Sequence, residues 1–491
     1  MQEPSSSPAG VLAPPSPVPL APSGDGTRSR LVARAGAIAA AAVAVTILLL
    51  PALWNRFPLL QYDSGGYIAR WYEDWLVPSR STTFGLFLHL GEWPDFWPVI
   101  VVQSALTVWV VGLTLRVFGL GGKPWRSAAL IGGLAVATAL PWLTSAILTD
   151  VFVGLGVLAL HLLVVRPAAL RRGETIGLFL VVAFAAASHT GTLAVLLALV
   201  AAAFAATLVR RPVAPLAAIG RGAAALLVGA AMLLATNLAL GHRLAWTPGG
   251  YAIPFGRMLQ DGIVARYLDD TCGRKVFALC PYRHDLPATA DLFFWGGSMF
   301  DRLGRFDGMA AEMRAIVRGS LAAYPGLQAE KAAEATAEQL AANGTGWGMG
   351  DDLWHTYGII GHYLPGMVPA MRAARQQRGE IDFARLNRLH RPVAAISMIL
   401  AVGLIGWSVV RRRPAPLAPL ALLASSVMLA ILANAVVCGA ISGPHDRYGA
   451  RVAWLATLVV AMAAMAMVQA RRRDGTGRDG AGSGGEADPA D

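Results

Sequence analysis

Apolar runs of about 20 residues recur along this chain, and short arginine-bearing stretches separate them. A bilayer core of roughly 30 Å needs about that length of α-helix, because each helical residue advances the chain by about 1.5 Å. Hydrophobic residues make up 55% of the 491 residues and charged residues only 14%, which excludes an ordinary soluble protein. The sequence therefore predicts an all-α polytopic membrane protein.

Ten runs are predicted to be transmembrane helices, two of them shorter than the rest. They cover residues 34–54, 97–119, 127–147, 151–165, 175–188, 190–208, 222–240, 393–410, 416–440 and 449–469. The first run is too long for the core of a typical secretory signal, so an uncleaved span is favoured over a cleaved signal peptide. The runs group into a bundle at 31–241 and a final set of three helices at 393–470.

Basic residues gather after every second run. They are Arg28, Arg30 and Arg34 before the first run, then Lys123, Arg126, Arg166, Arg171, Arg172, Arg210, Arg211, Arg221, Arg411, Arg412, Arg413, Arg471, Arg472 and Arg473. Short basic loops stay on the cytoplasmic side, which predicts an inner (plasma) membrane protein with both termini in the cytoplasm. The formal net charge of +11 follows from this pattern, and no nucleic-acid partner is implied.

Four segments lie outside the runs. Residues 1–30 are rich in Pro, Ser, Ala and Gly, and residues 471–491 are rich in Gly and charge, so both are predicted to be disordered and cytoplasmic. The segment 55–96 forms the first outer loop, and 242–392 is long enough for a mostly helical outer domain. Within that domain, alanines and charges at helical spacing predict two amphipathic helices separated at Tyr324-Pro325-Gly326.

Two of the three cysteines, Cys272 and Cys280, fall on the outer side, where disulfides persist. A disulfide that closes this short loop is favoured over two free thiols. A zinc site with His284 would have only three visible ligands, at a spacing that matches no strong zinc pattern. Cys438 lies inside an apolar run and is interpreted as a small packing residue.

Ionisable residues stand at the outer ends of the predicted spans. Asp63 follows the first run among small residues, Asp150 stands at the turn before the fourth, and His189 stands at the turn before the sixth. The last outer turn carries His445, Asp446, Arg447, Tyr448 and Arg451. For Asp150, a helix N-cap at Thr149 or Asp150 is the alternative interpretation. Together the four turns predict a polar cavity at membrane level that is open to the outside.

The pattern resembles the GT-C superfamily of polytopic glycosyltransferases, which take a polyprenyl-phosphate sugar as donor and work on the outer or luminal face. The matching stretches are "YDSGGY" at 62–67, "PSRSTTFGLFL" at 78–88, "LTDVF" at 148–152 and "DRYGARVAWL" at 446–455. The resemblance covers roughly residues 30 to 240 and the last two spans. The segment 242–392 matches no motif, and we expect it to hold the acceptor.

The resemblance implies a role for each site residue. Asp63 is the expected general base for the acceptor hydroxyl, and Asp150 is a second site acid or metal ligand. The expected substrate-binding residues are Arg80, Arg447 and Arg451 on the lipid phosphate, with His189, His445 and Tyr448 beside them. No cofactor is required, and a divalent metal is an option, although no second acid follows Asp63 at the spacing usual in that family. The partners are the polyprenyl-phosphate sugar and a lipid or glycan acceptor of the cell envelope.

Two other functions are considered. A lipid or solute transporter or flippase predicts charges or broken helices near the midplane, whereas the run interiors are nearly free of ionisable residues and His161 lies nearer the cytoplasmic end. A non-enzymatic envelope scaffold leaves the outer acids without a joint purpose. The aromatic residues Tyr62, Tyr67, Trp71, Tyr72 and Trp75 are interpreted as interface anchors, with stacking on a sugar as the alternative.

Overall fold

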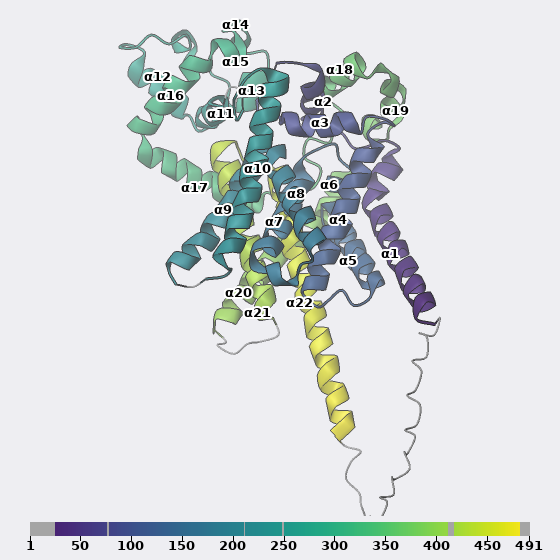
Figure 1. The fold of residues 1–491 in the computed structure, drawn as a ribbon. Coiled ribbons are helices and arrows are strands. Elements are labelled where there is room, and N and C mark those ends of the chain that lie inside the picture. The colour runs from purple at the N-terminus through teal and green to yellow at the C-terminus, as the bar shows by residue number, and fades with distance from the viewer. Residues whose placement is uncertain (1–24, 76–77, 211, 248–249, 411–416, 482–491) are drawn as a thin grey trace, which may run out of the picture.

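The computed structural model describes residues 25–75, 78–210, 212–247, 250–410 and 417–481, and these residues fold into helices. Within them the backbone forms no β-strand, apart from an isolated bridge between Leu59 and Ala146. Long helices run side by side as a bundle, and shorter helices cover one of its ends (Figure 1). We call this covered end the outer end, following the orientation predicted from the arginines.

The bundle contains ten helices at the positions of the predicted runs. They are α1 (Asp25–Asn55), α4 (Trp97–Val117), α5 (Pro124–Ala137), α7 (Asp150–Val165), α8 (Arg172–Ser188), α9 (Thr190–Leu208), α10 (Leu216–Gly241), α20 (Phe383–Val410), α21 (Ala418–Ala435) and α22 (Asp446–Ala481). A short helix, α6 (Leu140–Thr144), follows α5, and a π-helical segment, η5 (Val436–Ala440), continues α21.

Seven helices of the described chain are long and apolar enough to cross a membrane, by length and composition. They are α1, α4, α9, α10, α20, α21 with η5, and α22. The protein is therefore a multi-pass helical membrane protein. The other three predicted spans form α5, α7 and α8, which have 14, 16 and 17 residues and are shorter than a typical spanning helix of about 20 residues.

Helix α7 lies at the centre of the bundle. Its residues from Asp150 to Val164 are all buried, which explains why its sequence is apolar on every face. Gly154 permits the closest contact, because a Cβ at this position would lie 2.5 Å from the ring of Trp454 on α22. This packing brings the first turn of α7 next to the first turns of α22.

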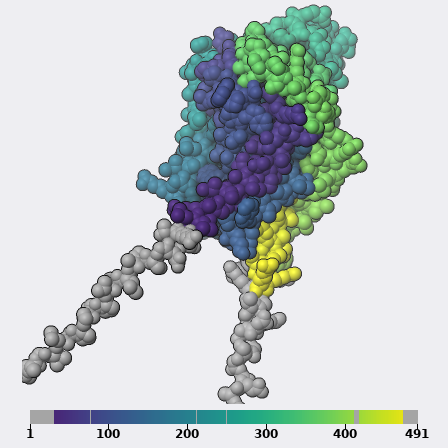
Figure 2. Space-filling model, turned by 90° about the vertical axis from the view of Figure 1, so that its right-hand side faces the viewer, coloured from purple at the N-terminus to yellow at the C-terminus, as the bar shows by residue number. Residues whose placement is uncertain are grey.

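The first outer loop forms two short helices, α2 (Ser64–Tyr72) and α3 (Thr82–Leu90), that pack against each other. Helix α3 is attached to α10 by a hydrogen bond of 2.7 Å from the Thr82 hydroxyl to Asn237. Helix α18 (Trp354–Tyr363) packs on α2, where Thr356 donates its hydroxyl proton to the carbonyl oxygen of Gln61. Figure 2 shows from another side that residues coloured green cover this end of the molecule.

The segment 242–392 divides into two parts. Residues between Ala252 and Val317 have a hydrophobic core of their own, built on α11 (Ala252–Gln260), α12 (Ile263–Thr271), α13 (Ala290–Trp295), α14 (Met299–Arg302), α15 (Arg305–Gly308) and α16 (Ala310–Ala323). The following helix, α17 (Pro325–Ala341), returns to the bundle, where a Cβ on Gly439 would lie 2.5 Å from the carbonyl oxygen of Ala335. The predicted pair of helices around Tyr324 is confirmed as α16 and α17.

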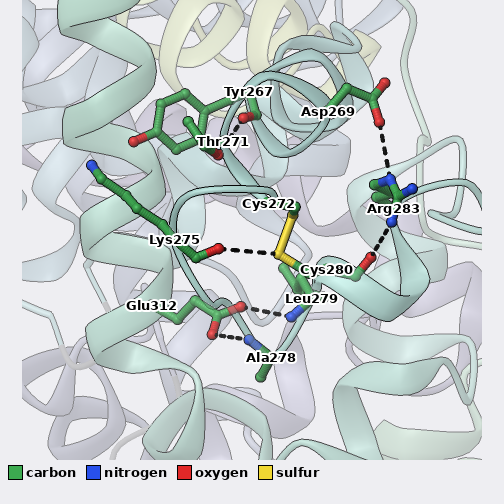
Figure 3. The surroundings of a disulfide bond; sticks show 10 residues. All are labelled: Tyr267, Asp269, Thr271, Cys272, Lys275, Ala278, Leu279, Cys280, Arg283 and Glu312. Atoms are coloured by element: carbon green, nitrogen blue, oxygen red, sulfur yellow. Dashed lines mark hydrogen bonds and ion pairs between the residues drawn. A yellow bond between two sulfur atoms is a disulfide. The ribbon is translucent and has the colours of Figure 1, made fainter.

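A disulfide bond joins Cys272 and Cys280 at the end of α12 (Figure 3). Glu312 of α16 stabilises the closed loop, because its carboxylate accepts the backbone N–H groups of Ala278 at 2.6 Å and Leu279 at 2.9 Å. The remaining cysteine, Cys438, is free and buried in η5.

Residues 25–30 and 471–481, which were predicted to be disordered, lie in helices in the structure. Helix α1 begins at Asp25 and includes residues 25–30, and α22 continues through residues 471–481 (Figure 1). A helix that is already nucleated in the bundle extends at little cost, because each further residue adds a backbone hydrogen bond. The rest of the predicted disorder, at 1–24 and 482–491, falls outside the described residues.

Candidate functional site at the outer end of the bundle

Three arginine and two aspartate side chains meet at the outer end and form an alternating row of charges. Arg80 donates to one carboxylate oxygen of Asp63, and Arg447 donates to the other. Arg447 also donates from Nε to Oδ2 of Asp150 at 2.6 Å. Arg451 ends the row, with its Nη1 3.6 Å from Oδ1 of Asp150. We call these five residues the charge row.

Separate elements deliver the members of the charge row. Asp63 directly precedes α2, Arg80 precedes α3, and Asp150 is the first residue of α7. Arg447 and Arg451 are four residues apart in α22, so they lie on one face of that helix and can reach the same carboxylate. The arrangement therefore depends on the packing of α7 against α22 described above.

Burial divides the charge row into a sealed part and an accessible part. The side chains of Asp150, Arg447 and Arg451 are 1%, 6% and 0% exposed. Those of Asp63 and Arg80 are 18% and 20% exposed. Asp63 and Arg80 are therefore the members of the charge row that solvent reaches, and Arg447 connects Asp63 to the sealed part.

The environment of Asp63 keeps its carboxylate ionised. Burial alone would raise its pKa, but the charges of Arg80 and Arg447 outweigh that effect and lower the pKa to about 2. A carboxylate with such a low pKa holds a proton poorly. In this arrangement Asp63 is thus a weak base, and the loss of either arginine from its side would raise its pKa.

Arg451 was predicted to contact a lipid phosphate, but it is enclosed by protein groups. Its Nε and Nη2 donate to the side-chain oxygen of Asn434 at 3.0 and 2.8 Å, and Nη2 lies 3.0 Å from the sulfur of Cys438. Its side chain has no exposed surface. Arg451 is therefore a positioning residue that fixes Asp150 and the start of α22.

Asp150 was predicted to be a second site acid or a metal ligand. Its two oxygens are occupied by Arg447, at 2.6 and 3.3 Å, and its side chain is buried. Nor does Thr149, the N-cap of α7, make a side-chain cap hydrogen bond. Asp150 acts as the counter-ion that aims Arg447 toward Asp63.

A divalent metal does not fit this site. Among the described residues, no group of three or more His, Cys, Asp and Glu side chains is arranged to hold a metal ion. The two aspartates of the site are bridged by the guanidinium of Arg447 in the place where a shared cation would have to lie.

The three remaining predicted binding residues surround the charge row. His189 joins α8 to α9 and caps α9, because its Nδ1 accepts the backbone N–H of Gly191 at 3.1 Å. Burial, together with the charges of Arg451 and Arg447, lowers the pKa of His189 to about 3, so the ring is neutral. His445 and Tyr448 flank Arg447 and belong to a group of aromatic rings considered below.

Gln61 is a site residue that the sequence did not single out. Its side chain is fully buried, and its Oε1 accepts the backbone N–H of Asp63 at 2.7 Å and Nη1 of Arg447 at 3.3 Å. Gln61 thus couples the backbone at Asp63 to the arginine that holds it. This role of Gln61 was not predictable, because a glutamine in a loop has no distinctive sequence pattern. Asn434, by contrast, is a polar residue near the end of an apolar run, a position that indicates a buried contact.

The first outer loop also contains Arg70, which the sequence analysis left without a role. Its side chain has no exposed surface, its Nε donates to the carbonyl oxygen of Gly66 at 3.2 Å, and Glu73 lies 3.4 Å away. Burial lowers its pKa to about 10. Glu73 is half-buried and also accepts the hydroxyl of Tyr363 at 3.1 Å.

No family model matches this chain, and neither a curated protein nor a solved structure is significantly similar to it. The class that the fold and site define is a multi-pass helical membrane protein with a charged cluster at one end of its bundle. Any further statement of function has to come from the chemistry of that cluster.

Proposed function

We propose that this protein is a membrane glycosyltransferase of the GT-C type, which moves a sugar from a polyprenyl-phosphate donor to an acceptor in the cell envelope. The reaction would take place on the outer face of the inner membrane, with both termini in the cytoplasm. In this proposal α5, α7 and α8 also cross the membrane, giving ten spans, because the packed bundle can contain shorter crossing helices.

The observation that carries the proposal is the partly exposed Asp63 between two arginines. Asp63 and Arg80 are accessible, and Arg447 lies on the other side of the carboxylate. Inverting glycosyl transfer needs a carboxylate that accepts the acceptor proton and a cation that stabilises the departing phosphate. A carboxylate and two guanidinium groups are in direct contact here, which supports the proposal.

In the proposed step, the acceptor hydroxyl oxygen forms a bond to the anomeric carbon of the donor sugar. The bond from that carbon to the phosphate oxygen breaks, and its electron pair remains on the polyprenyl phosphate. The hydroxyl proton passes to the carboxylate of Asp63, and the configuration at the anomeric carbon inverts.

Donor binding would activate the base. Arg80 and Arg447 together hold the pKa of Asp63 at about 2. A phosphate that binds Arg80 through its forked donors would draw that guanidinium away from Asp63 and add negative charge nearby. Both changes raise the pKa of Asp63, so the carboxylate would become a stronger base when the donor is in place.

The sealed part of the charge row would then hold Asp63 in position. With Arg80 on the phosphate, Arg447 still holds one oxygen of Asp63 and is itself fixed by Asp150 and Gln61. Preorganised charges of this kind lower the barrier because they do not have to reorient during the reaction.

A transporter or flippase fits these contacts less well. Transporter sites lie near the bilayer midplane and use broken helices, whereas this charge row lies where α7 and α22 begin. His161 lies deeper in α7, and it contacts Ser426 at 2.9 Å. Among the described residues, no carboxylate forms an ion pair with it, and the nearby charge that acts on it is that of Arg166.

The test is Asp63→Asn, which keeps the size of the side chain and removes its basic oxygen. Turnover should fall by a factor on the order of 100 to 10,000, while binding of the donor is retained. The assay follows sugar transfer from a panel of polyprenyl-phosphate sugars to a membrane extract, at equal amounts of folded protein. Asp74→Asn is the matched control, because Asp74 is exposed and lies outside the charge row.

The proposal fails if the wild-type protein transfers no sugar from any donor of the panel. A protein that instead moves a lipid or solute across vesicles would be a transporter. If Asp63→Asn keeps full transfer, the base is another group, and Glu73 is the next accessible carboxylate of the same loop.

A further inference from the structure

Four aromatic rings form a continuous group beside the charge row. The rings of Tyr62 and Trp347 meet edge to face at 6.2 Å, and Trp347 stacks on His445 at 4.2 Å with an angle of 26° between the planes. His445 contacts Tyr448 at 5.7 Å, and the guanidinium of Arg447 lies 5.8 Å from the centre of the Tyr448 ring. We call Tyr62, Trp347, His445 and Tyr448 the aromatic corner.

Two glycines fix the position of Trp347. Gly346 and Gly348 have φ angles of +91° and +73°, which favour glycine. A Cβ on Gly346 would lie 2.2 Å from the ring of Phe383, and one on Gly348 would lie 2.3 Å from Nε2 of Gln61. The loop therefore fits against the bundle only with glycine on both sides of Trp347.

The corner is attached to the charge row through backbone and side-chain contacts. The N–H of Tyr62 donates to the carbonyl oxygen of Gly348 at 3.2 Å, and Tyr62 directly precedes Asp63. Gln339 of α17 holds His445 by accepting its N–H at 2.9 Å and donating to its carbonyl oxygen at 3.0 Å. Movement of the rings relative to Asp63 is thus restricted from both sides.

Part of the corner is open. The side chain of Tyr62 is 49% exposed, and Trp347, His445 and Tyr448 are half-buried. Burial lowers the pKa of His445, so its ring is neutral and stacks on Trp347 without a charge of its own. The corner presents flat apolar surface directly next to an accessible carboxylate and guanidinium.

We infer that the aromatic corner is a sugar subsite, in which a pyranose ring packs against Tyr62 and Trp347 with its reacting carbon or hydroxyl toward Asp63. This inference rests on the proposed function and names the part of the chain that orients the sugar. A pyranose has a face made of C–H groups, which packs on aromatic rings, and a rim of hydroxyls, which binds charged groups. The corner and the charge row offer these two kinds of surface side by side.

The polyprenyl chain of the donor is a weaker candidate for this position. An isoprenoid requires a continuous apolar wall, whereas the corner is bordered by Gln61, Asp63 and Asp446. Asp446 follows His445 and pairs with Arg391 at 2.6 Å. Polar groups on these sides suit hydroxyls and would leave a hydrocarbon chain poorly covered.

The experiment measures binding of simple sugars to the full chain in nanodiscs, without any transfer. Saturation-transfer difference NMR is recorded with methyl glucopyranoside, galactopyranoside and mannopyranoside, and with farnesyl phosphate. In the wild type, ring C–H protons of at least one glycoside should receive saturation. Trp347→Leu and Tyr62→Leu should weaken that binding about five- to tenfold, the effect of losing one aromatic contact.

Two variants control for folding and for general loss of tryptophan. Trp347→Phe keeps an aromatic ring and should retain most of the signal. Trp125→Leu removes a tryptophan that is 53% exposed at the start of α5 and should behave as the wild type. Melting temperatures of all variants identify any that fail to fold, and Trp347→Phe keeps the test valid if Trp347→Leu is one of them.

The inference is overturned if Trp347→Leu and Tyr62→Leu bind the glycosides as the wild type does, or if the wild type binds none of them. Saturation of the farnesyl chain alone, lost in Trp347→Leu, would assign the corner to the lipid. This inference and the proposed function can fail separately. Glycosides that bind without any transfer would support the subsite and contradict the transferase. Transfer without glycoside binding would support the transferase and contradict the subsite.

Discussion

Arg447 and Asp150 form a buried ion pair at 2.6 Å between residues that are 297 positions apart in the sequence. The pair connects the first turn of α22 to the first turn of α7, and it orients the guanidinium toward Asp63. Charges buried at this depth are costly unless each has a partner, so the two residues depend on each other.

This dependence predicts strong coupling between two substitutions. Asp150→Leu alone leaves Arg447 without its buried counter-ion and should lower the free energy of unfolding by about 3 to 5 kcal/mol. The double variant Asp150→Leu, Arg447→Met should lose less than the sum of the single variants, because neither charge is left alone. Melting curves of the four proteins in one detergent measure this, and additive losses would contradict the pairing.

Donor binding should depend on Arg80. Replacing it by alanine removes the cation that we place on the phosphate, so affinity for a polyprenyl phosphate should fall about tenfold or more, the worth of a charge-assisted contact. Arg305→Ala is the control, since this arginine pairs with Asp301 on the outer part, away from the charge row. Equal affinity of Arg80→Ala and wild type for farnesyl phosphate would remove Arg80 from the binding site.

The folded protein should become less stable as the pH falls, because His189 is kept neutral in the fold. Its pKa is lowered to about 3 in the folded protein, against an ordinary value of about 6.5. Between these values the unfolded chain binds the proton and the folded chain does not, so folding becomes less favourable as the pH falls from about 6.5 toward 3, by up to about 1.4 kcal/mol per pH unit.

The variant His189→Asn tests this effect, because asparagine also caps a helix but does not titrate. Melting temperatures are measured from pH 7 to pH 4. The wild type should lose stability more steeply than the variant across this range. Parallel curves for the two proteins would show that another group is responsible for the acid sensitivity.

The disulfide should stabilise the outer part formed by α11 to α16. Replacing Cys272 and Cys280 together by serine increases the conformational entropy of the unfolded loop. The free energy of unfolding should therefore fall by roughly 2 to 4 kcal/mol. Limited proteolysis of that part reports the loss. Alkylation of both thiols in native, unreduced protein would exclude the bond, and Cys438 is buried, so it should not react under those conditions.

The orientation is tested by labelling single cysteines with an impermeant reagent in intact cells. Cysteines at Gly326 and Asp352, which are exposed on the covered end, should react from outside. One at Gly122, which is exposed in the loop between α4 and α5, should react only after lysis. Reaction of the Gly122 position in intact cells would reverse the orientation.

The sequence by itself determined the membrane class, the position of most bundle helices and the break at Tyr324, because each of these depends on local hydrophobicity and chain stiffness. The predicted run at 127–147 is instead divided into α5, which ends at Ala137, and the short α6. Proximity of Asp63, Asp150 and Arg447 to one another was also expected, since all three stand at outer ends of predicted spans. Their partners were not predictable, because a linear pattern does not state which face of α22 packs on α7.

Only the tertiary structure decided which charged groups are sealed and which are open. Burial converts Asp150 and Arg451 into positioning residues and leaves Asp63 and Arg80 accessible. Long-range packing also places Trp347, which comes from a segment without a recognised motif, in a stacked contact with His445 next to the charge row. The physical reason is that long-range packing, here a glycine on α7 against Trp454, sets the depth of each side chain, and no local propensity encodes that depth.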